Sequence, residues 1–152
     1  MKLDSLIGNG LLLKTKASEE EINGSLGIAE RFLEKAKGNM KIGYFDVAFS
    51  LAYQSMFHAA RALLFKNNLK ERSHSAMVSA LKEIYAKEEG LLKLLHTLDS
   101  YRITRHAIQY TGSGCSKEDA GEAINDAEKF INLSDKILFD KKTKNGKKKS
   151  KG

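Results

Sequence analysis

Apolar residues recur along this chain at spacings of three and four, which is the period of an α-helix. The pattern predicts five helices, which cover roughly residues 19–38, 44–66, 74–88, 91–110 and 117–138. Proline, which interrupts helices because it lacks a backbone donor, is absent from all 152 residues. The sequence therefore predicts an all-α fold, a five-helix up-and-down bundle within residues 18–139.

Several of the predicted helices have recognisable starts and ends. Ser18–Glu21 and Ser116–Asp119 have the spacing of a capping box, in which serine and acidic side chains satisfy each other's backbone amides. Ser73 is a candidate N-cap for the third helix. Gly90 is expected to separate the third helix from the fourth, and Thr111–Gly114 to end the fourth.

Residues 44–66 form the most apolar of the predicted helices. A ridge of small side chains runs along it at Ala48, Ala52, Ser55, Ala59 and Ala62. Small residues allow a neighbouring helix to approach closely, and a helix that is hydrophobic around much of its circumference is buried. We therefore expect this helix to lie at the centre of the bundle.

Three segments lie outside the helical pattern. In the N-terminal extension, residues 1–17, Gly8–Gly10 indicates a turn, and apolar Leu11–Leu13 fits either a short strand or a helical turn. Leu69–Arg72 is expected to be a polar connection. Residues 140–152 form a basic tail that is expected to be disordered, because positions 141–152 hold no apolar residue.

The formal net charge of +7 belongs to the tail alone. Seven lysines and no acidic residue occupy positions 141–152, so the remaining residues carry 19 basic and 19 acidic side chains. Affinity for nucleic acid must therefore come from a local patch, or from the tail, which adds affinity without specificity.

Composition indicates a globular protein of the cytoplasm. Hydrophobic residues make up 41% of the chain and charged residues 30%. The one cysteine, Cys115, excludes an intramolecular disulfide and suits a reducing compartment. The first residues lack the apolar segment of a signal peptide, and no run approaches the length of a membrane span, so we expect no membrane segment.

The fourth predicted helix carries the candidate functional residues. Its first half is rich in leucine, and its second half places Arg102, Arg105, His106 and Gln109 on one face, followed by Tyr110. Two arginines can hold a phosphate in bidentate forks, and a histidine can move a proton near neutral pH. These groups fit a phosphate-binding or acid–base site, with Arg105 and His106 as the candidate catalytic pair.

A structural explanation of this polar stripe, the residues Arg102, Arg105, His106 and Gln109, stays open. In this explanation the two arginines pair with carboxylates such as Asp99, and His106 caps the core. Metal-free RNA cleavage, by contrast, needs a group that takes the 2′-hydroxyl proton, one that protonates the leaving oxygen, and cations. Two-fold symmetry in a dimer can supply the second histidine from a partner chain.

The sequence predicts no metal and no cofactor. The four histidines, including His58 and His74, show no metal-ligand spacing with cysteine or glutamate. His58 is expected to be a hydrogen-bonded core residue, and Cys115 an inert thiol. The glycine-containing turns are too short for a phosphate loop.

Three segments together resemble the HEPN superfamily of small helical-bundle proteins. Ala52–Leu64 is similar to that family's aromatic-x-x-Met/Ala-Phe-His-Ala-Ala-Arg-Ala-Leu segment. Glu71–His74 looks like its Lys/Arg-Ser/Thr-His helix entry, and Arg102–Tyr110 like an Arg-x-x-Arg-His-x-x-Gln-Tyr pattern. The resemblance covers roughly residues 18–138.

The resemblance implies a homodimer-forming bundle that is frequently encoded beside a minimal nucleotidyltransferase. Many such pairs behave as toxin and antitoxin, and the HEPN partner is a metal-independent RNase with an Arg-x4–6-His motif. Arg105 matches the motif arginine, but Tyr110 stands where a histidine is expected five residues on, and His106 takes a position often filled by asparagine. Arg102 and His106 have three residues between them, one fewer than the motif.

Three hypotheses follow. The first is a module that binds nucleotide or RNA phosphates, or its nucleotidyltransferase, without cutting. The second is a metal-independent endoribonuclease with a shifted motif, in which Arg105 holds the phosphate and His106 or Tyr110 acts as acid or base. The third is a purely structural interaction protein, for which the apolar helices are sufficient.

Overall fold

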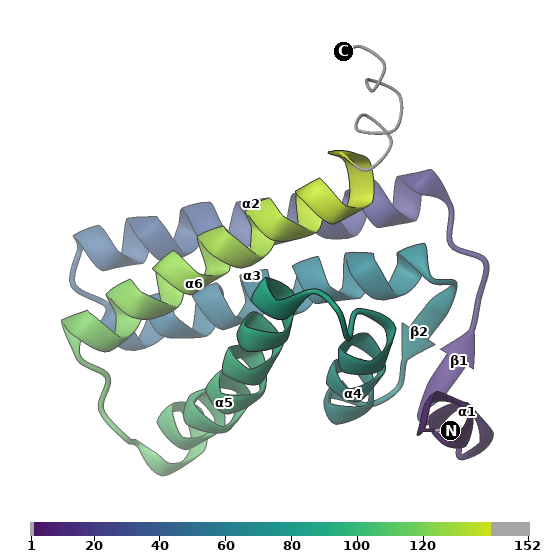
Figure 1. Cartoon of the computed structure of the whole chain (residues 1–152). Helices are drawn as coiled ribbons and strands as arrows, with labels where there is room; N and C mark the ends of the chain where they lie inside the picture. The colour runs from purple at the N-terminus through teal and green to yellow at the C-terminus, as the bar shows by residue number, and fades with distance from the viewer. Residues whose placement is uncertain (1, 141–152) are drawn as a thin grey trace.

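The computed structural model describes residues 2–140 (Figure 1). Its elements are α1 (Lys2–Gly8), β1 (Leu12–Lys14), α2 (Glu19–Lys41), α3 (Phe45–Lys66), β2 (Leu69–Glu71), α4 (His74–Ile84), α5 (Glu89–Thr111), α6 (Lys117–Asp135) and a π-helical turn (Lys136–Asp140). The predicted all-α class is confirmed. Of the predicted tail, residues 140–152, Asp140 ends the π-helical turn, and positions 141–152 lie outside the described residues.

Helix α3 is the centre of the fold, as expected. It contacts α2, α4, α5, α6 and β2, and α6 also packs on α2. Figure 1 shows α2 and α6 running along α3, whereas α4 and α5 run obliquely to it. The fold therefore combines three helices that run along one another, α2, α3 and α6, with two oblique ones, so the up-and-down arrangement is wrong for α4 and α5.

The ridge of small residues on α3 is fully buried. Ala48, Ala52, Ser55, Ala59 and Ala62 are all 0% exposed. The Ser55 hydroxyl donates to the carbonyl of Ala29 on α2 at 2.7 Å, so this buried polar group is satisfied. Small side chains and cross-helix hydrogen bonds thus hold α2 close against α3.

The predicted helix starts are confirmed. Capping boxes form at Ser18–Glu21 and at Ser116–Asp119. The Ser73 hydroxyl accepts a hydrogen bond from the Ala76 amide at 3.2 Å and caps α4. Gly112 ends α5 with a φ of 74°, a left-handed conformation that glycine adopts without steric cost.

The five-helix count and the polar connection were wrong. The N-terminal region forms both a sixth helix, α1, and strand β1, which pairs antiparallel with β2. The ladder aligns Leu12 with Glu71 and Lys14 with Leu69, and it buries Leu12 and Leu69. Because these strands are short and far apart in the sequence, no local pattern marks their pairing.

Two boundaries between helices also differ from the prediction. Helix α4 ends at Ile84 instead of residue 88, and the Tyr85 hydroxyl accepts a hydrogen bond from Asn67 Nδ2 at 2.9 Å. Gly90 is the second residue of α5 and does not separate two helices. At the first turn of a helix, a glycine interrupts few intrahelical hydrogen bonds, so α5 tolerates it there.

We predict that Ala59→Leu lowers the free energy of unfolding by about 1–3 kcal/mol, because the larger side chain overpacks the ridge on α3. Chemical denaturation measures the change. Ala86→Leu is the matched control, since Ala86 is exposed and should tolerate the same substitution. Equal stability of the two variants would contradict close packing at Ala59.

Candidate functional site

Helix α5 is divided into a core half and an exposed half. Leu91, Leu94, Leu95 and Leu98 are buried. Beyond them Ile103 is 60% exposed and Tyr110 is 66% exposed. The polar stripe therefore begins where α5 leaves the core, and its residues divide between two sides of the helix.

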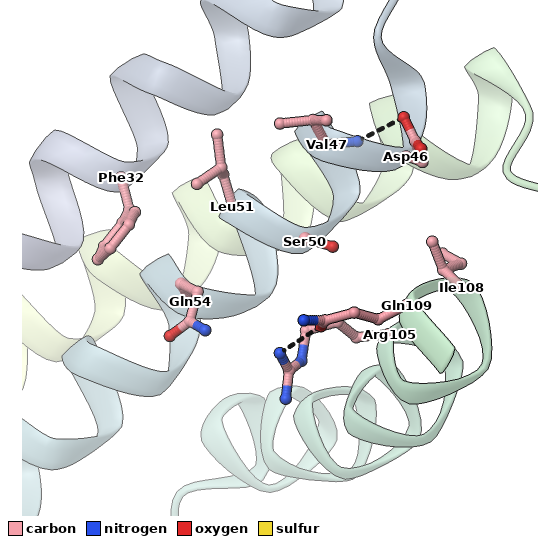
Figure 2. A pocket seen from close by; sticks show the side chains of 9 residues that line it. All are labelled: Phe32, Asp46, Val47, Ser50, Leu51, Gln54, Arg105, Ile108 and Gln109. Carbon is pink, nitrogen blue, oxygen red and sulfur yellow. Dashed lines mark hydrogen bonds between the residues drawn. The ribbon is translucent and has the colours of Figure 1, made fainter. Parts of the chain in front are cut away.

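Arg105 points from α5 toward α3 (Figure 2). Its guanidinium lies over the ring of Tyr53, with Cζ 4.8 Å from the ring centroid, a cation–π contact. One terminal nitrogen donates to Gln109 Oε1 at 2.9 Å, while its Nε is buried without an acceptor. Within residues 2–140, Arg105 forms no ion pair with a carboxylate.

A first pocket, the Phe32 pocket, opens on one side of Arg105 and has a volume of about 590 Å³. It is lined by Phe32, Asp46, Val47, Ser50, Leu51, Gln54, Arg105, Ile108 and Gln109. Figure 2 shows Arg105 and Gln109 reaching toward the α3 residues Ser50 and Gln54. The pocket therefore combines apolar walls with polar groups that come from two helices.

A second pocket, the Tyr53 pocket, adjoins the first and has a volume of about 380 Å³. It is lined by Tyr53, Gln54, Phe57, Glu71, Arg72, Ser73, His74 and Arg105. Gln54 and Arg105 line both pockets. Arg105 thus stands between two adjoining hollows, each of which mixes polar and apolar lining residues.

His74 is held in the Tyr53 pocket by aromatic contacts and one hydrogen bond. Its ring stacks on Tyr53 and on Phe57 with centroid distances of 5.7 Å for both, and its Nδ1 lies 2.8 Å from the Tyr53 hydroxyl. Its Nε2 is buried without a partner. Burial, reinforced by the positive charge of Arg102, lowers the pKa of His74 to about 4, so the ring is neutral at pH 7.

Arg102 takes part in the ion pair that the structural explanation anticipated. Its Nε lies 3.6 Å from Asp99 Oδ1, which is too long for a hydrogen bond, and this Nε is buried without an acceptor. The structural explanation therefore describes Arg102 in part but does not describe Arg105.

His106 and Tyr110 lie apart from both pockets. Both are exposed, and their rings contact each other with centroids 4.7 Å apart. The idea that His106 caps the core was wrong, because its side chain is exposed. Within one chain, the structure brings Arg105 and Gln109 together, places Arg102 nearby, and leaves His106 and Tyr110 outside.

Sequence reasoning did not name Tyr53, Gln54, Glu71 or His74 as site residues. Their signal was present in the segments Ala52–Leu64 and Glu71–His74, which carried the family resemblance. Nothing local in the sequence shows that these segments meet Arg105, because α3, β2, α4 and α5 converge only in the folded chain.

His58 differs from its expected role. It was expected to be hydrogen-bonded, but its ring stacks on Phe32 with centroids 5.6 Å apart, and its Nδ1 is buried without a partner. Burial, together with the charge of Arg61, lowers the pKa of His58. Aromatic stacking therefore replaces the expected hydrogen bond.

In the described part of the chain, no group of three or more His, Cys, Asp or Glu residues is placed to hold a metal ion. No helix among the same residues has both the length and the apolar character needed to cross a membrane.

Comparison with known proteins gives concordant matches. Residues 23–137 match the family model of the HEPN domain. A protein of Methanocaldococcus jannaschii with the name "Putative toxin" is 30% identical over 83% of this chain and 95% of its own length. A UPF0332 protein of Gloeobacter violaceus is 32% identical over 72% of this chain and 90% of its own length. A second "Putative toxin" of M. jannaschii is 24% identical over 81% and 85% of the two lengths.

We predict that stability falls as the pH is lowered from about 6.5 toward about 4. The pKa of His74 is about 4 in the folded chain and about 6.5 unfolded, so the unfolded state binds the proton more tightly throughout this window. His74→Phe keeps the stacking and removes the titrating group, so its free energy of unfolding should vary less with pH. His96→Phe, on the exposed side of α5, should keep the wild-type dependence. Parallel plots of the free energy of unfolding against pH for wild type and His74→Phe would contradict the lowered pKa of His74.

Proposed function

This chain belongs to the HEPN domain family, and on that premise we propose that it is a toxin-like module that binds RNA or nucleotide phosphates. The candidate binding residues are Arg105 and Gln109, with Arg102 beside them. His106 and Tyr110, the other predicted binding residues, are assigned to a protein contact on the exposed side of α5 that lines neither pocket.

The observation that carries this proposal is a buried donor without an acceptor. The Nε atom of Arg105, which lines both pockets, is buried and has no hydrogen-bond partner among the described residues. The Nε atom of Arg102 also lacks a hydrogen bond, although Asp99 lies 3.6 Å away and offsets its charge. Buried polar groups are nearly always hydrogen-bonded, so unpartnered donors indicate a missing acceptor. Phosphate oxygens fit arginine donors best, because the guanidinium matches their geometry and carries the opposite charge.

The Phe32 pocket supports a nucleotide ligand over a bare anion. Its volume of about 590 Å³ is in the range of small-molecule sites. Phe32, Leu51 and Ile108 offer apolar surface for a base, while Gln54 and Gln109 offer donors and acceptors for its edge. A nucleotide can therefore place its base there with its phosphate at Arg105.

The homodimer, the minimal nucleotidyltransferase partner and the cytoplasmic location stay predictions of this proposal. Exposed Ile103 and Tyr110 support a protein contact on α5, since large apolar side chains gathered on one surface often mark an interface. A toxin–antitoxin pair fits the names of two relatives.

A second candidate is a metal-independent endoribonuclease. The relatives' toxin names favour it, and so does the exposed His106 ring, which can reach a substrate held outside α5. Since His106 lies outside the Arg105 pockets of its own chain, this mechanism needs the two residues to come from different chains of a dimer.

We predict that Arg105→Gln weakens the binding of a short single-stranded RNA by at least about tenfold, because it removes a charge-assisted contact to phosphate. Fluorescence anisotropy at about 0.15 M salt measures the affinity while screening weak surface attraction. Glutamine keeps a polar side chain but is shorter than arginine, so the loss reports the charge, the fork geometry and the reach of Arg105 together.

Arg31→Gln is the matched control for this binding experiment. Arg31 is exposed on α2, lines neither pocket, and loses the same charge on substitution. It should bind as wild type does. An equal loss of RNA affinity in both variants would show that binding depends on overall charge alone, and it would contradict the proposed site at Arg105.

The endoribonuclease candidate predicts RNA cleavage in the presence of a metal chelator. Arg105→Ala and His106→Ala should each abolish cleavage, and mixing the two variants should restore part of it if a dimer joins the residues from different chains. Intact RNA after incubation with well-folded wild type would remove this candidate and leave the binding module.

A further inference from the structure

Glu71 presents a buried acceptor in the Tyr53 pocket. Its side chain is 7% exposed, and Oε2 accepts hydrogen bonds from Nε and a terminal nitrogen of Arg61. The other oxygen, Oε1, is buried without a partner. A carboxylate oxygen in this position can accept a hydrogen bond from a ligand, and the paired Arg61 offsets the carboxylate charge.

His74 presents a nitrogen without a partner in the same pocket. The Tyr53 hydroxyl, whose pKa is raised by burial, keeps its proton and can donate it to His74 Nδ1. The hydrogen of the neutral ring then lies on Nε2, which is buried and has no partner. Together with Arg105 Nε, this gives two donors and one acceptor that await a ligand.

The aromatic faces in this pocket are already occupied. Arg105 and His74 cover Tyr53, while Arg61 lies 5.0 Å from the Phe57 centroid and His74 stacks on the same ring. A nucleobase that stacked here would have to compete with these contacts. The pocket suits the polar part of a nucleotide, and the base belongs in the adjoining Phe32 pocket.

We propose that the Tyr53 pocket is a ribose-phosphate subsite that distinguishes RNA from DNA. Arg105 and His74 Nε2 donate to the phosphodiester oxygens, and Glu71 Oε1 accepts from the ribose 2′-hydroxyl. The 2′-hydroxyl is the group by which a protein can tell RNA from DNA at one site. This inference rests on the proposed function and adds the kind of sugar that the site selects.

The test compares two dinucleotides that differ only at the sugar, UpU and its 2′-deoxy counterpart. Binding is followed by NMR titration, including the ¹⁵N shifts of the His74 ring. Wild type should prefer UpU by about tenfold or more, because the deoxy ligand leaves Glu71 Oε1 buried and unpaired. UpU should also change the ¹⁵N shift of His74 Nε2, because the hydrogen that this nitrogen already carries gains a phosphate acceptor. Equal affinities for the two ligands, or an unchanged His74 ring, would overturn the proposal.

Matched variants separate the acceptor from the ion pair. Glu71→Met removes the acceptor, so the ratio of the affinity for UpU to the affinity for its deoxy counterpart should fall to near one. Arg61→Met breaks the same ion pair but keeps the acceptor, so it should retain the preference for UpU. A ratio that survives in Glu71→Met, or that disappears equally in both variants, would overturn the role of Glu71. If Glu71→Met does not fold, UpU with a 2′-O-methyl group tests the same contact on wild type, since it lacks the donor. Undiminished binding of that ligand is the contradicting result.

Two further comparisons distinguish a failure of this subsite proposal from a failure of the proposed phosphate-binding function. Inorganic phosphate should bind more weakly than UpU, and equal or tighter binding would overturn the assignment to a phosphodiester. If Arg105→Gln weakens UpU and its deoxy counterpart alike while wild type binds both equally, the proposed function stands and the sugar selectivity fails. If wild type binds no single-stranded RNA, both fail.

Discussion

The close approach of α2 and α3 is the constraint on which the rest of this fold depends. Alanine and serine side chains on α3 leave room for the backbone of α2, and the Ser55 hydroxyl reaches the carbonyl of Ala29. With α3 enclosed by small residues on that side, its larger side chains, Tyr53 and Phe57, face α4 and α5. The candidate site therefore lies where the tight side of α3 gives way to its aromatic side.

Charge and burial are balanced unusually at this site. Arg105 is partly buried on Tyr53 without a carboxylate, whereas Arg61 and Glu71 pair fully on the other side of the pocket. Burial, reinforced by the positive charges of Arg102 and Arg105, lowers the pKa of His74 and keeps the ring neutral. The charged side chains that line the two pockets sum to zero: they are Asp46, Glu71, Arg72 and Arg105. A preference for an anionic ligand therefore rests on the Arg105 guanidinium, which forms no ion pair with a carboxylate within the described residues.

The arrangement also separates two roles within one helix. The inner side of α5 supplies Arg105 and Gln109 to the pockets, while the outer side presents His106, Tyr110 and Ile103. One face is suited to a ligand and the other to a protein surface. The binding module and the endoribonuclease differ in whether a second chain brings the outer side of one α5 to the inner side of another.

The sequence by itself determined the helices, the capping boxes at Ser18 and Ser116, the central position of α3 and the importance of Arg105 as a cation. These features depend on residues within a few positions of one another, so spacing and cap chemistry are sufficient to predict them. Only the tertiary structure decided that β1 pairs with β2, that the Arg105 side of α5 meets α3 while the His106 side stays exposed, and that Glu71 and His74 join the Arg105 pocket. Those outcomes depend on contacts between segments distant in the chain, and on the rotation of α5 about its axis, which the packing of its buried leucines fixes.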